Sequence, residues 1–238
     1  MLQAEYARNL HTMDIIRQKN CEILQVCAGI VQSRGVFYKW EVIADGRPKQ
    51  SKGKVENDMD FSILYAIQNM RSPVLDSLIL ALTRIMGSYG QIWLIVGVAL
   101  CIFRKTRRCG TTVLLSYVLV FLLGQLVLKD WIARARPCHL DQAVQLLVER
   151  PSSYSCPSTH TAWAFAAATS ILLYFRKSGI CVMIFAALIG FSRLYLFVHF
   201  PTDVLLGAVL GVALAFIAVL LQKVALRQLE ARRVRRKQ

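Results

Sequence analysis

The chain has 238 residues, 55% of them hydrophobic, and a mean hydropathy of +0.45, so it is more apolar than typical soluble domains of this length. Lysine and arginine outnumber acidic residues 29 to 14, which gives a net charge of +15. The basic residues gather in short runs between apolar segments and do not alternate with aromatic residues along helices. This pattern argues against nucleic-acid binding and is typical of the cytoplasmic loops of membrane proteins.

Residues 1–58 are polar and of mixed charge, and they lack the apolar stretch that a secretory signal peptide needs. Residues 13–31 have the spacing of an amphipathic helix, and residues 36–43 favour a short strand before a turn at Asp45-Gly46. We interpret residues 1–58 either as an N-terminal cytoplasmic arm of unknown role or as the product of an upstream start site, and the sequence leaves both open.

Apolar segments follow one another from residue 70 to residue 221. Five of them approach the ~20 residues that cross a bilayer as a helix. These five are residues 87–103, 110–128, 161–175, 179–198 and 204–221. A sixth, 74–86, contains Asp76 and Arg84 and is either a short span, which we favour, or an interfacial helix. The predicted fold is an all-α, polytopic membrane bundle of five or six transmembrane helices, with a membrane domain over 59–221 and a basic cytoplasmic tail over 222–238.

Basic runs predict the orientation of these helices. Residues 104–108, 176–177 and 232–237 are rich in lysine and arginine and are therefore expected in the cytoplasm. Alternation from these anchors places residues 129–159 and 200–201 on the opposite side. We therefore predict a multi-pass protein of the cytoplasmic membrane whose polar residues meet at the extracytoplasmic face.

The first polar cluster contains two cations at the outer end of an apolar segment. Lys129 and Arg136 are seven residues apart, or two helical turns, so that one helix face would present both. Pro137 then turns the chain into a loop. The planar guanidinium of arginine can donate two parallel hydrogen bonds to a phosphate, and the lysine ammonium adds a compact positive charge. The alternative is a pair of interfacial cations that extend to water.

The second cluster, Pro157-Ser158-Thr159-His160, directly precedes an apolar run and has the composition of a helix start. A helix N-terminus binds anions through its free N–H groups. Ser158 is either part of such a site or a simple N-cap. His160 is either an interfacial histidine or a general acid that donates a proton to a leaving oxygen.

The third cluster places a cation, a histidine and a carboxylate around a helix break. Arg193 lies in an apolar span, which is a costly position for a charge without a function. Asp203 follows His199 by four residues, with Pro201 between them, and it can orient the imidazole for nucleophilic attack. The alternative is a structural cap pair.

In order, the clusters read Lys-x6-Arg-Pro, Pro-Ser-x-His and Ser-Arg-x5-His-x3-Asp. This ordered set resembles the type-2 phosphatidic acid phosphatase superfamily, which includes membrane lipid phosphatases, glucose-6-phosphatase and the vanadium haloperoxidases. The motifs run from Lys129 to Asp203, and the helical pattern extends the likeness over residues 59–221. The family usually has glycine where this chain has Thr159, and a side chain there changes how the backbone N–H approaches a phosphate.

The resemblance implies a role for each polar residue. His199 would be the nucleophile that forms a phosphohistidine, Asp203 would orient it, and His160 would protonate the leaving group and then activate water. The residues that would hold the phosphoryl oxygens are Lys129, Arg136, Ser158, Thr159 through its backbone, and Arg193. We expect no metal and no cofactor, because Asp130 and Asp203 are the only carboxylates in these clusters and a metal-dependent phosphatase needs several oxygen ligands.

The implied activity is hydrolysis of a membrane lipid phosphate or diphosphate, and the short loops look like those of the undecaprenyl-diphosphate phosphatases in this superfamily. Phosphatidic acid or phosphatidylglycerophosphate is the alternative substrate. A non-catalytic transporter or lipid-binding protein would account for the helices but not for two outward histidines with their cations, and the soluble haloperoxidase branch does not fit the spans. Membrane lipids are the expected partners, and the sequence does not indicate an oligomeric state.

Two further pairs have structural interpretations. Cys138 and Cys156 flank the predicted outer loop, where a disulfide between the first two motifs is possible, and the alternative is two independent small apolar residues. Gly207 and Gly211 form a small-xxx-small pair that predicts close helix packing.

Overall fold

A computed structural model describes residues 40–42, 48–50 and 59–236 of the protein. The chain divides into two units, Met1–Glu56 and Asn57–Gln238. All of the predicted site residues belong to the second unit.

The first unit contains a short antiparallel strand pair, β1 (Trp40–Val42) and β2 (Pro48–Gln50). β1 lies within the strand predicted over residues 36–43. The rest of that segment, the predicted helix over 13–31 and the turn at Asp45 lie outside the described residues.

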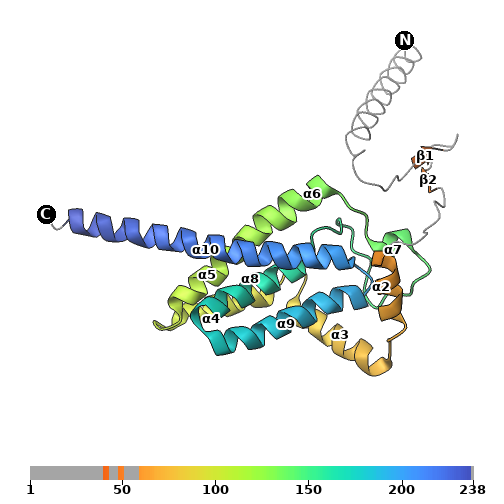
Figure 1. The fold of residues 1–238 in the computed structure, drawn as a ribbon, viewed down its shortest axis with the longest axis horizontal. Coiled ribbons are helices and arrows are strands. Elements are labelled where there is room, and N and C mark those ends of the chain that lie inside the picture. Colours follow the sequence, from red (N-terminus) through yellow and green to blue (C-terminus); the bar gives the residue numbers. More distant parts are fainter. Residues whose placement is uncertain (1–39, 43–47, 51–58, 237–238) are drawn as a thin grey trace, which may run out of the picture. The chain divides into compact units, whose positions relative to one another are not determined.

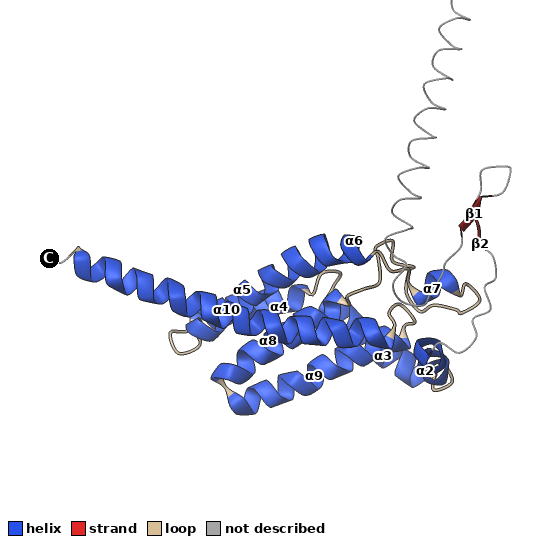
Figure 2. Cartoon of the chain, turned by 45° about the horizontal axis from the view of Figure 1, so that its top comes forward, coloured by secondary structure: helices blue, strands red, loops and turns tan. Residues whose placement is uncertain are grey.

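The second unit is built from helices, and its described residues include no strand. Figure 1 and Figure 2 show these helices packed side by side as a bundle, from which the end of α10 projects. In chain order they are α2 (Met59–Gln68), α3 (Pro73–Met86), α4 (Gln91–Ile102), α5 (Arg107–Leu119), the π-helix η1 (Val120–Leu128), α6 (Lys129–Ile132), α7 (Pro137–Leu140), α8 (Thr159–Tyr174), α9 (Arg176–Tyr195) and α10 (Pro201–Arg235). The all-α helix bundle is therefore confirmed.

Local sequence signals account for several of the helix ends. The Ser72 side chain caps α3 by accepting a hydrogen bond from the Leu75 backbone N–H at 3.3 Å, and proline follows it at the first helical position. α3 ends at Gly87, whose φ of 65° lies in the left-handed region that glycine adopts without strain. The chain therefore turns sharply there, and the axes of α3 and α4 differ by 54°.

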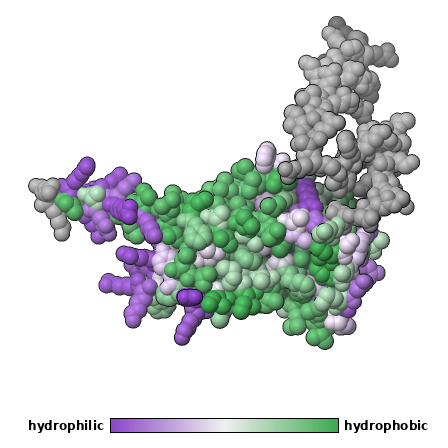
Figure 3. Space-filling view, in the orientation of Figure 1, coloured by the Kyte–Doolittle hydropathy of each residue, from purple (hydrophilic) through white to green (hydrophobic). Residues whose placement is uncertain are grey.

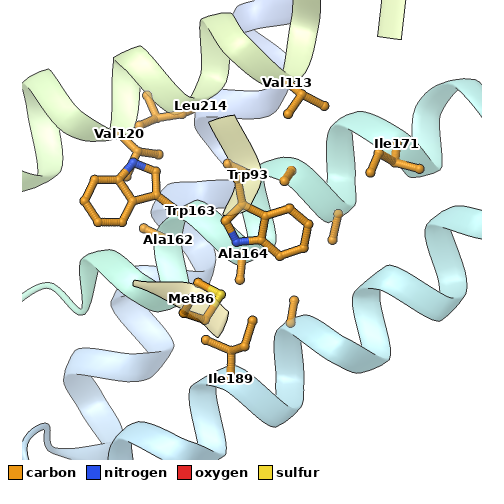
Figure 4. Close-up of a cluster of buried hydrophobic side chains, with 14 of the residues drawn as sticks. Met86, Trp93, Val113, Val120, Ala162, Trp163, Ala164, Ile171, Ile189 and Leu214 are labelled. Carbon is orange, nitrogen blue, oxygen red and sulfur yellow. The ribbon is translucent and has the colours of Figure 1, made fainter. Parts of the chain in front are cut away.

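Helix α8 lies inside the bundle and contacts α4, α5, η1, α9 and α10. Its sequence is rich in alanine, threonine and serine, small residues that let neighbouring helices approach closely. Ala162, Ala164 and Ala168 have no exposed surface. Figure 4 shows the resulting core, in which the Trp93 and Trp163 rings lie beside Ala162 and Ala164.

Helix α10 packs closely on α8 at two glycines. A Cβ atom on Gly207 would overlap the Ser158 carbonyl oxygen, and one on Gly211 would overlap the Ala162 carbonyl oxygen. The packing role predicted for this pair is therefore confirmed. The contact also places the start of α10 beside the start of α8.

Among the described residues, three segments are long and apolar enough to cross a membrane, Arg107–Leu140, Arg176–Tyr195 and Pro201–Arg235, and α3 with α4 makes a fourth if that bent pair is one span. This count of three or four is lower than the predicted five or six. The two apolar segments before residue 103 form one bent pair, and α8, at 16 residues, is shorter than the ~20 residues of a full span. Figure 3 shows hydrophobic side chains over the flank of the bundle and hydrophilic ones on the projecting end of α10.

Candidate functional site

One end of the bundle contains a cavity of about 950 Å³ to which all three polar clusters contribute. Six of the eight predicted site residues line it: Lys129, Arg136, Thr159, His160, Arg193 and His199. Ser158 and Asp203 have no exposed surface and are not among the lining residues. Thr159, which follows Ser158, and His199, which lies beside Asp203, do line the cavity. Ser158 and Asp203 therefore lie behind the cavity wall.

His199 follows a tight turn at the end of α9. The N–H of Phe197 donates to the Leu194 carbonyl at 2.9 Å and that of Val198 to the Arg193 carbonyl at 3.3 Å, a Schellman pattern in which Phe197 takes the left-handed conformation, with φ 58°. The helix therefore ends at Tyr195, six residues before Pro201. This turn brings His199 to the cavity wall.

The hydrogen bonds of His199 determine which of its nitrogens is free to react. Arg136 Nη1 lies 3.1 Å from His199 Nε2, and an arginine can only donate, so Nε2 carries the lone pair. The proton of the neutral ring is then on Nδ1, which lies 3.4 Å from Ser155 Oγ and 3.8 Å from Asp203 Oδ2. Burial lowers the pKa of the His199 imidazole to about 3, and Asp203 only partly opposes this effect.

Asp203 is held from several directions at the start of α10. Its Oδ2 accepts hydrogen bonds from the Phe200 backbone N–H at 2.9 Å and from Ser155 Oγ at 2.5 Å, and its Oδ1 accepts one from Arg134 at 2.7 Å. Helix starts favour a negative side chain, and Pro201 occupies the first helical position. The structure therefore places this carboxylate directly behind the nucleophile candidate.

Lys129 and Arg136 reach the cavity by a different route from the predicted one. α6 ends at Ile132 and residues 133–136 are not helical, so the expectation that one helix face presents both cations is wrong. Ala133, at φ 48°, ends the helix in a left-handed turn. Arg136 then donates to the Ser153 carbonyl at 2.7 Å and to the Val198 carbonyl at 2.9 Å, and Lys129 Nζ donates to Ser153 Oγ at 3.4 Å.

Arg193 enters the cavity from the last turn of α9. Its guanidinium donates to Thr83 Oγ1 at 2.7 Å and to Ser192 Oγ at 3.1 Å, and the side chain is 4% exposed. Both partners are neutral, so the positive charge remains uncompensated. A buried cation in this state is suited to an anionic ligand.

The second cluster forms the first turn of α8, with Ser158 as the N-cap residue. The Ser158 hydroxyl hydrogen-bonds to Thr161 Oγ1 at 2.9 Å and does not face the cavity. Thr159 Oγ1 donates to Gln125 Oε1 at 3.2 Å, which keeps this side chain against the π-helix η1. The helix N-terminus itself thus opens on the cavity at Thr159 and His160.

His160 is hydrogen-bonded to the break between α3 and α4. Its Nε2 donates to the Gly87 carbonyl at 3.0 Å, and its ring lies edge-on to Trp163. Because Nε2 carries the proton of that bond, Nδ1 is the atom available for proton transfer. The sharp turn at Gly87 therefore helps to position the candidate acid.

Sequence reasoning missed several residues that hold the site together. They are Asp60, Thr83, Gly87, Arg134, Ser153 and Ser155. The serines belong to a polar loop in which nothing distinguishes one hydroxyl from another. Arg134 did have a signal, since it is a third basic residue in the first cluster.

The hypothesis of a Cys138–Cys156 disulfide is wrong in this structure, because both residues are free thiols. Both are buried in the site end of the bundle. The alternative reading, two independent small residues, is the one that the structure supports.

A model of the PAP2 superfamily matches residues 110–227, which contain all three clusters. Phosphatidylglycerophosphatase B of Bacillus subtilis is 35% identical over 172 residues, or 66% of this chain and 80% of that protein. The chain belongs to the PAP2 superfamily. The resemblance predicted from the three motifs is therefore confirmed.

Two further PAP2 proteins show the extent of the similarity. An undecaprenyl-diphosphatase of Sulfolobus acidocaldarius is 36% identical over 137 residues, or 56% of this chain and 66% of that protein. The crystal structure of a transmembrane PAP2 type phosphatidylglycerolphosphate phosphatase from Bacillus subtilis matches with a TM-score of 0.55 and 33% identity, over 67% of this chain and 82% of that chain. These similarities extend the family assignment from the motifs to the helix bundle.

Among the described residues, no group of three or more histidine, cysteine, aspartate or glutamate side chains is arranged to hold a metal ion. The carboxylate nearest to the candidate nucleophile is Asp203, and its two oxygens are occupied by Arg134 and by Ser155 with the Phe200 N–H. The cavity is lined by five lysine or arginine side chains and one carboxylate, that of Glu149, so its lining suits an anion.

Proposed function

We propose that this chain is a membrane-embedded lipid phosphatase that acts through a phosphohistidine on His199, with undecaprenyl diphosphate as its substrate. The observation that carries the proposal is the single cavity in which two histidines and three buried or partly buried cations from distant segments meet. Membership of the PAP2 superfamily and its phosphatase-named relatives support the reaction class.

In the first step, His199 Nε2 attacks the terminal phosphorus. A P–N bond forms and the P–O bond to the lipid phosphate breaks. His160 enters this step as the imidazolium, with its Nε2–H bonded to the Gly87 carbonyl, and its Nδ1–H gives a proton to the leaving oxygen. Arg136 caps Nε2 at 3.1 Å before substrate arrives, so it must turn to the phosphoryl oxygens and release the lone pair. The imidazole becomes positive in the P–N intermediate, and Asp203 stabilises that charge across the 3.8 Å to Nδ1.

In the second step, His160 accepts a proton from water, the resulting hydroxide attacks the phosphorus, and the P–N bond breaks to release inorganic phosphate. The phosphoryl oxygens are held throughout by Lys129, Arg136 and Arg193 and by the N–H groups at the start of α8. Ser158 occupies the N-cap position of that helix, and its hydroxyl is bonded to Thr161 and does not face the cavity.

The cavity also supports a substrate larger than a single phosphate. Arg84 and Arg150 add positive charge to the lining outside the three clusters, which favours a diphosphate. Leu80, Leu147 and Leu196 supply an apolar part of the wall, which suits the start of a lipid chain. The named relatives include an undecaprenyl-diphosphatase, and the alternative, phosphatidylglycerophosphate or phosphatidic acid, is supported by the phosphatidylglycerophosphatase B relative.

The proposed location is the cytoplasmic membrane, with the cavity at its extracytoplasmic face. The basic runs after α4, at the start of α9 and at the end of α10 all lie at the other ends of helices that lead to the site. The positive-inside rule places those runs in the cytoplasm.

Phosphate release by the full chain in detergent tests the proposal. Undecaprenyl diphosphate, phosphatidylglycerophosphate and phosphatidic acid are compared with and without EDTA, and we expect the fastest turnover on the diphosphate and no effect of the chelator. His199→Ala should lower kcat by about a thousandfold or more, because no other group can form the intermediate. His139→Ala is the matched control, since this histidine does not line the cavity, and it should retain the wild-type rate.

A wild-type rate of phosphate release by His199→Ala would show that His199 is not the nucleophile. Loss of turnover in EDTA would contradict metal independence. No hydrolysis of any lipid phosphate, together with specific lipid binding, would favour the non-catalytic class.

A further inference from the structure

Arg134 lies behind the nucleophile and joins two carboxylates from distant parts of the chain. Its Nη1 donates to Asp203 Oδ1 at 2.7 Å, and its Nη2 donates to Asp60 Oδ2 at 2.8 Å. Thr202 closes the group by accepting from Arg134 at 2.7 Å and donating to Asp60 at 2.7 Å. In the described part of the chain no other cation forms ion pairs with two carboxylates.

Arg134 and Arg136 have different partners. Both lie in the non-helical segment 133–136, which follows the left-handed turn at Ala133. Here Arg136 is bonded to His199 and Ser153, whereas Arg134 is bonded to Asp60 and Asp203 and does not line the cavity. Arg136 is therefore positioned to contact substrate, whereas Arg134 binds the two carboxylates.

Asp203 depends on this arginine for its charge balance. The carboxylate has no exposed surface, and a buried charge is costly unless a partner compensates it. His199 is neutral in the resting site and lies 3.8 Å away, so it does not compensate the charge. Arg134 does so, and its bond to Oδ1 also fixes the plane of the carboxylate, so that Oδ2 stays directed at Ser155 and His199.

Asp60 and Phe200 in turn hold the guanidinium in place. Asp60 comes from α2 and is 8% exposed. The Phe200 ring lies beneath Arg134, with 4.0 Å between the guanidinium carbon and the ring centroid, and Phe61 of α2 packs edge-on against the same ring. Thus α2, which precedes the region matched to the PAP2 family, supports the catalytic carboxylate.

We propose that Arg134 is a positioning residue for catalysis, and that Asp60 acts through it: the Asp60–Arg134–Asp203 chain fixes the carboxylate that orients His199. The inference rests on the proposed function of His199. It adds Asp60 of α2, which lies outside the three motifs, and Arg134, which is an unspecified position within Lys-x6-Arg-Pro.

Kinetics of the full chain in detergent test this inference. Arg134→Gln should lower kcat on the order of 10- to 100-fold, the range for residues that orient a reacting side chain from behind, and leave KM within about twofold. Arg134→Lys keeps the charge and one donor, and it should recover part of that loss. Asp60→Asn should cause a smaller loss, and the Arg134→Gln/Asp60→Asn double variant should be no slower than Arg134→Gln alone.

Arg71→Gln is the matched control. Arg71 forms an ion pair with Asp76 at 3.3 Å, its side chain is 26% exposed against 30% for Arg134, and it does not line the cavity. This variant should keep the wild-type kcat, although it also loses an arginine–aspartate pair.

Three outcomes would overturn the inference. The first is a wild-type kcat in Arg134→Gln. The second is a raised KM in that variant with kcat unchanged. The third is an equal loss of kcat in Arg71→Gln. If Arg134→Gln does not fold, the comparison of Arg134→Lys and Asp60→Asn with wild type decides, because unchanged kcat in both would overturn it as well. Wild-type turnover and its loss in His199→Ala test the proposed function separately.

Discussion

At the level of single residues, the site keeps the proposed nucleophile, His199, neutral and aligned. His199 is 2% exposed, and Arg136 donates to Nε2, which requires the lone pair on the atom that is proposed to attack. Burial holds the pKa of this imidazole at about 3, so the ring is neutral near pH 7. The same burial makes His199 a source of acid sensitivity in the fold.

The direction of this pH effect on stability follows from the pKa of His199 in the folded and in the unfolded chain. The pKa of His199 is about 3 in the folded protein, against a model value of 6.5, so below pH 6.5 the unfolded chain binds a proton that the folded chain does not. The stability that the neutral ring contributes is complete above pH 6.5 and is lost as pH falls toward 3. By pH 5 the free energy of unfolding falls by about 2 kcal/mol from this group.

His199→Gln removes the titrating ring, so the variant should lose less stability on acidification than wild type does. Thermal unfolding in detergent at pH 7.5 and at pH 5 measures the difference, because the wild-type melting temperature should drop further between the two. Equal drops in the two proteins would contradict a buried, neutral His199.

At the level of secondary-structure elements, the close approach of α8 and α10 sets the geometry of the site. Thr159 and His160 begin α8, and Asp203 lies in the first turn of α10, so the spacing of the two helices places the proposed phosphate-binding turn beside the carboxylate. The Ser158 N–H also donates to the Asp203 carbonyl at 3.1 Å, which joins the two helix starts directly.

Gly211→Ala tests that packing. The added methyl group would overlap the Ala162 carbonyl oxygen and lie 3.0 Å from the Ala166 nitrogen, so the helices must separate, at a cost of about 1–3 kcal/mol. Thermal unfolding should show a lower melting temperature. Gly124→Ala is the control in η1, where the nearest atom would be 3.4 Å away, and it should be neutral or slightly stabilising. A Gly211→Ala variant as stable as the control would argue against tight α8–α10 contact.

At the level of the whole molecule, the second unit has two chemically different ends. The site occupies the end where α9 finishes and α8 and α10 begin, and the basic runs lie where α8 and α10 finish and α9 begins. Apolar side chains such as Leu122, Leu126, Val209 and Leu220 are exposed on the flank between them. This arrangement suits a bilayer around the flank, and it makes the proposed orientation testable.

Labelling of single introduced cysteines in intact cells measures the orientation. Ala143→Cys lies in an exposed position on the site side, and we expect a membrane-impermeant maleimide to label its peptide without permeabilisation. Arg232→Cys lies in the exposed, basic end of α10 and should be labelled only after permeabilisation. The reverse pattern would place the active site in the cytoplasm.

The sequence alone determined the reaction chemistry, the family and the helical class. Each motif is a short local pattern whose residue types act on phosphate in only a few ways, and apolar runs bounded by basic residues leave few alternatives to membrane helices. It was wrong where geometry had to be extrapolated along the chain. Lys129 and Arg136 do not share a helix face, because a left-handed residue ends the helix between them. The number of spans also depends on tertiary geometry, because two apolar segments form one bent pair and α8 is short.

Only the tertiary structure decided which charges pair with which. Asp60 and Arg134 are 74 residues apart, and no local pattern links them, yet their contact explains how Asp203 carries a buried charge. Likewise, the free thiols of Cys138 and Cys156 and the Gly87–His160 hydrogen bond depend on how whole helices pack. Residue types limit the chemistry that a site can perform, but long-range packing sets the distances on which pairing depends.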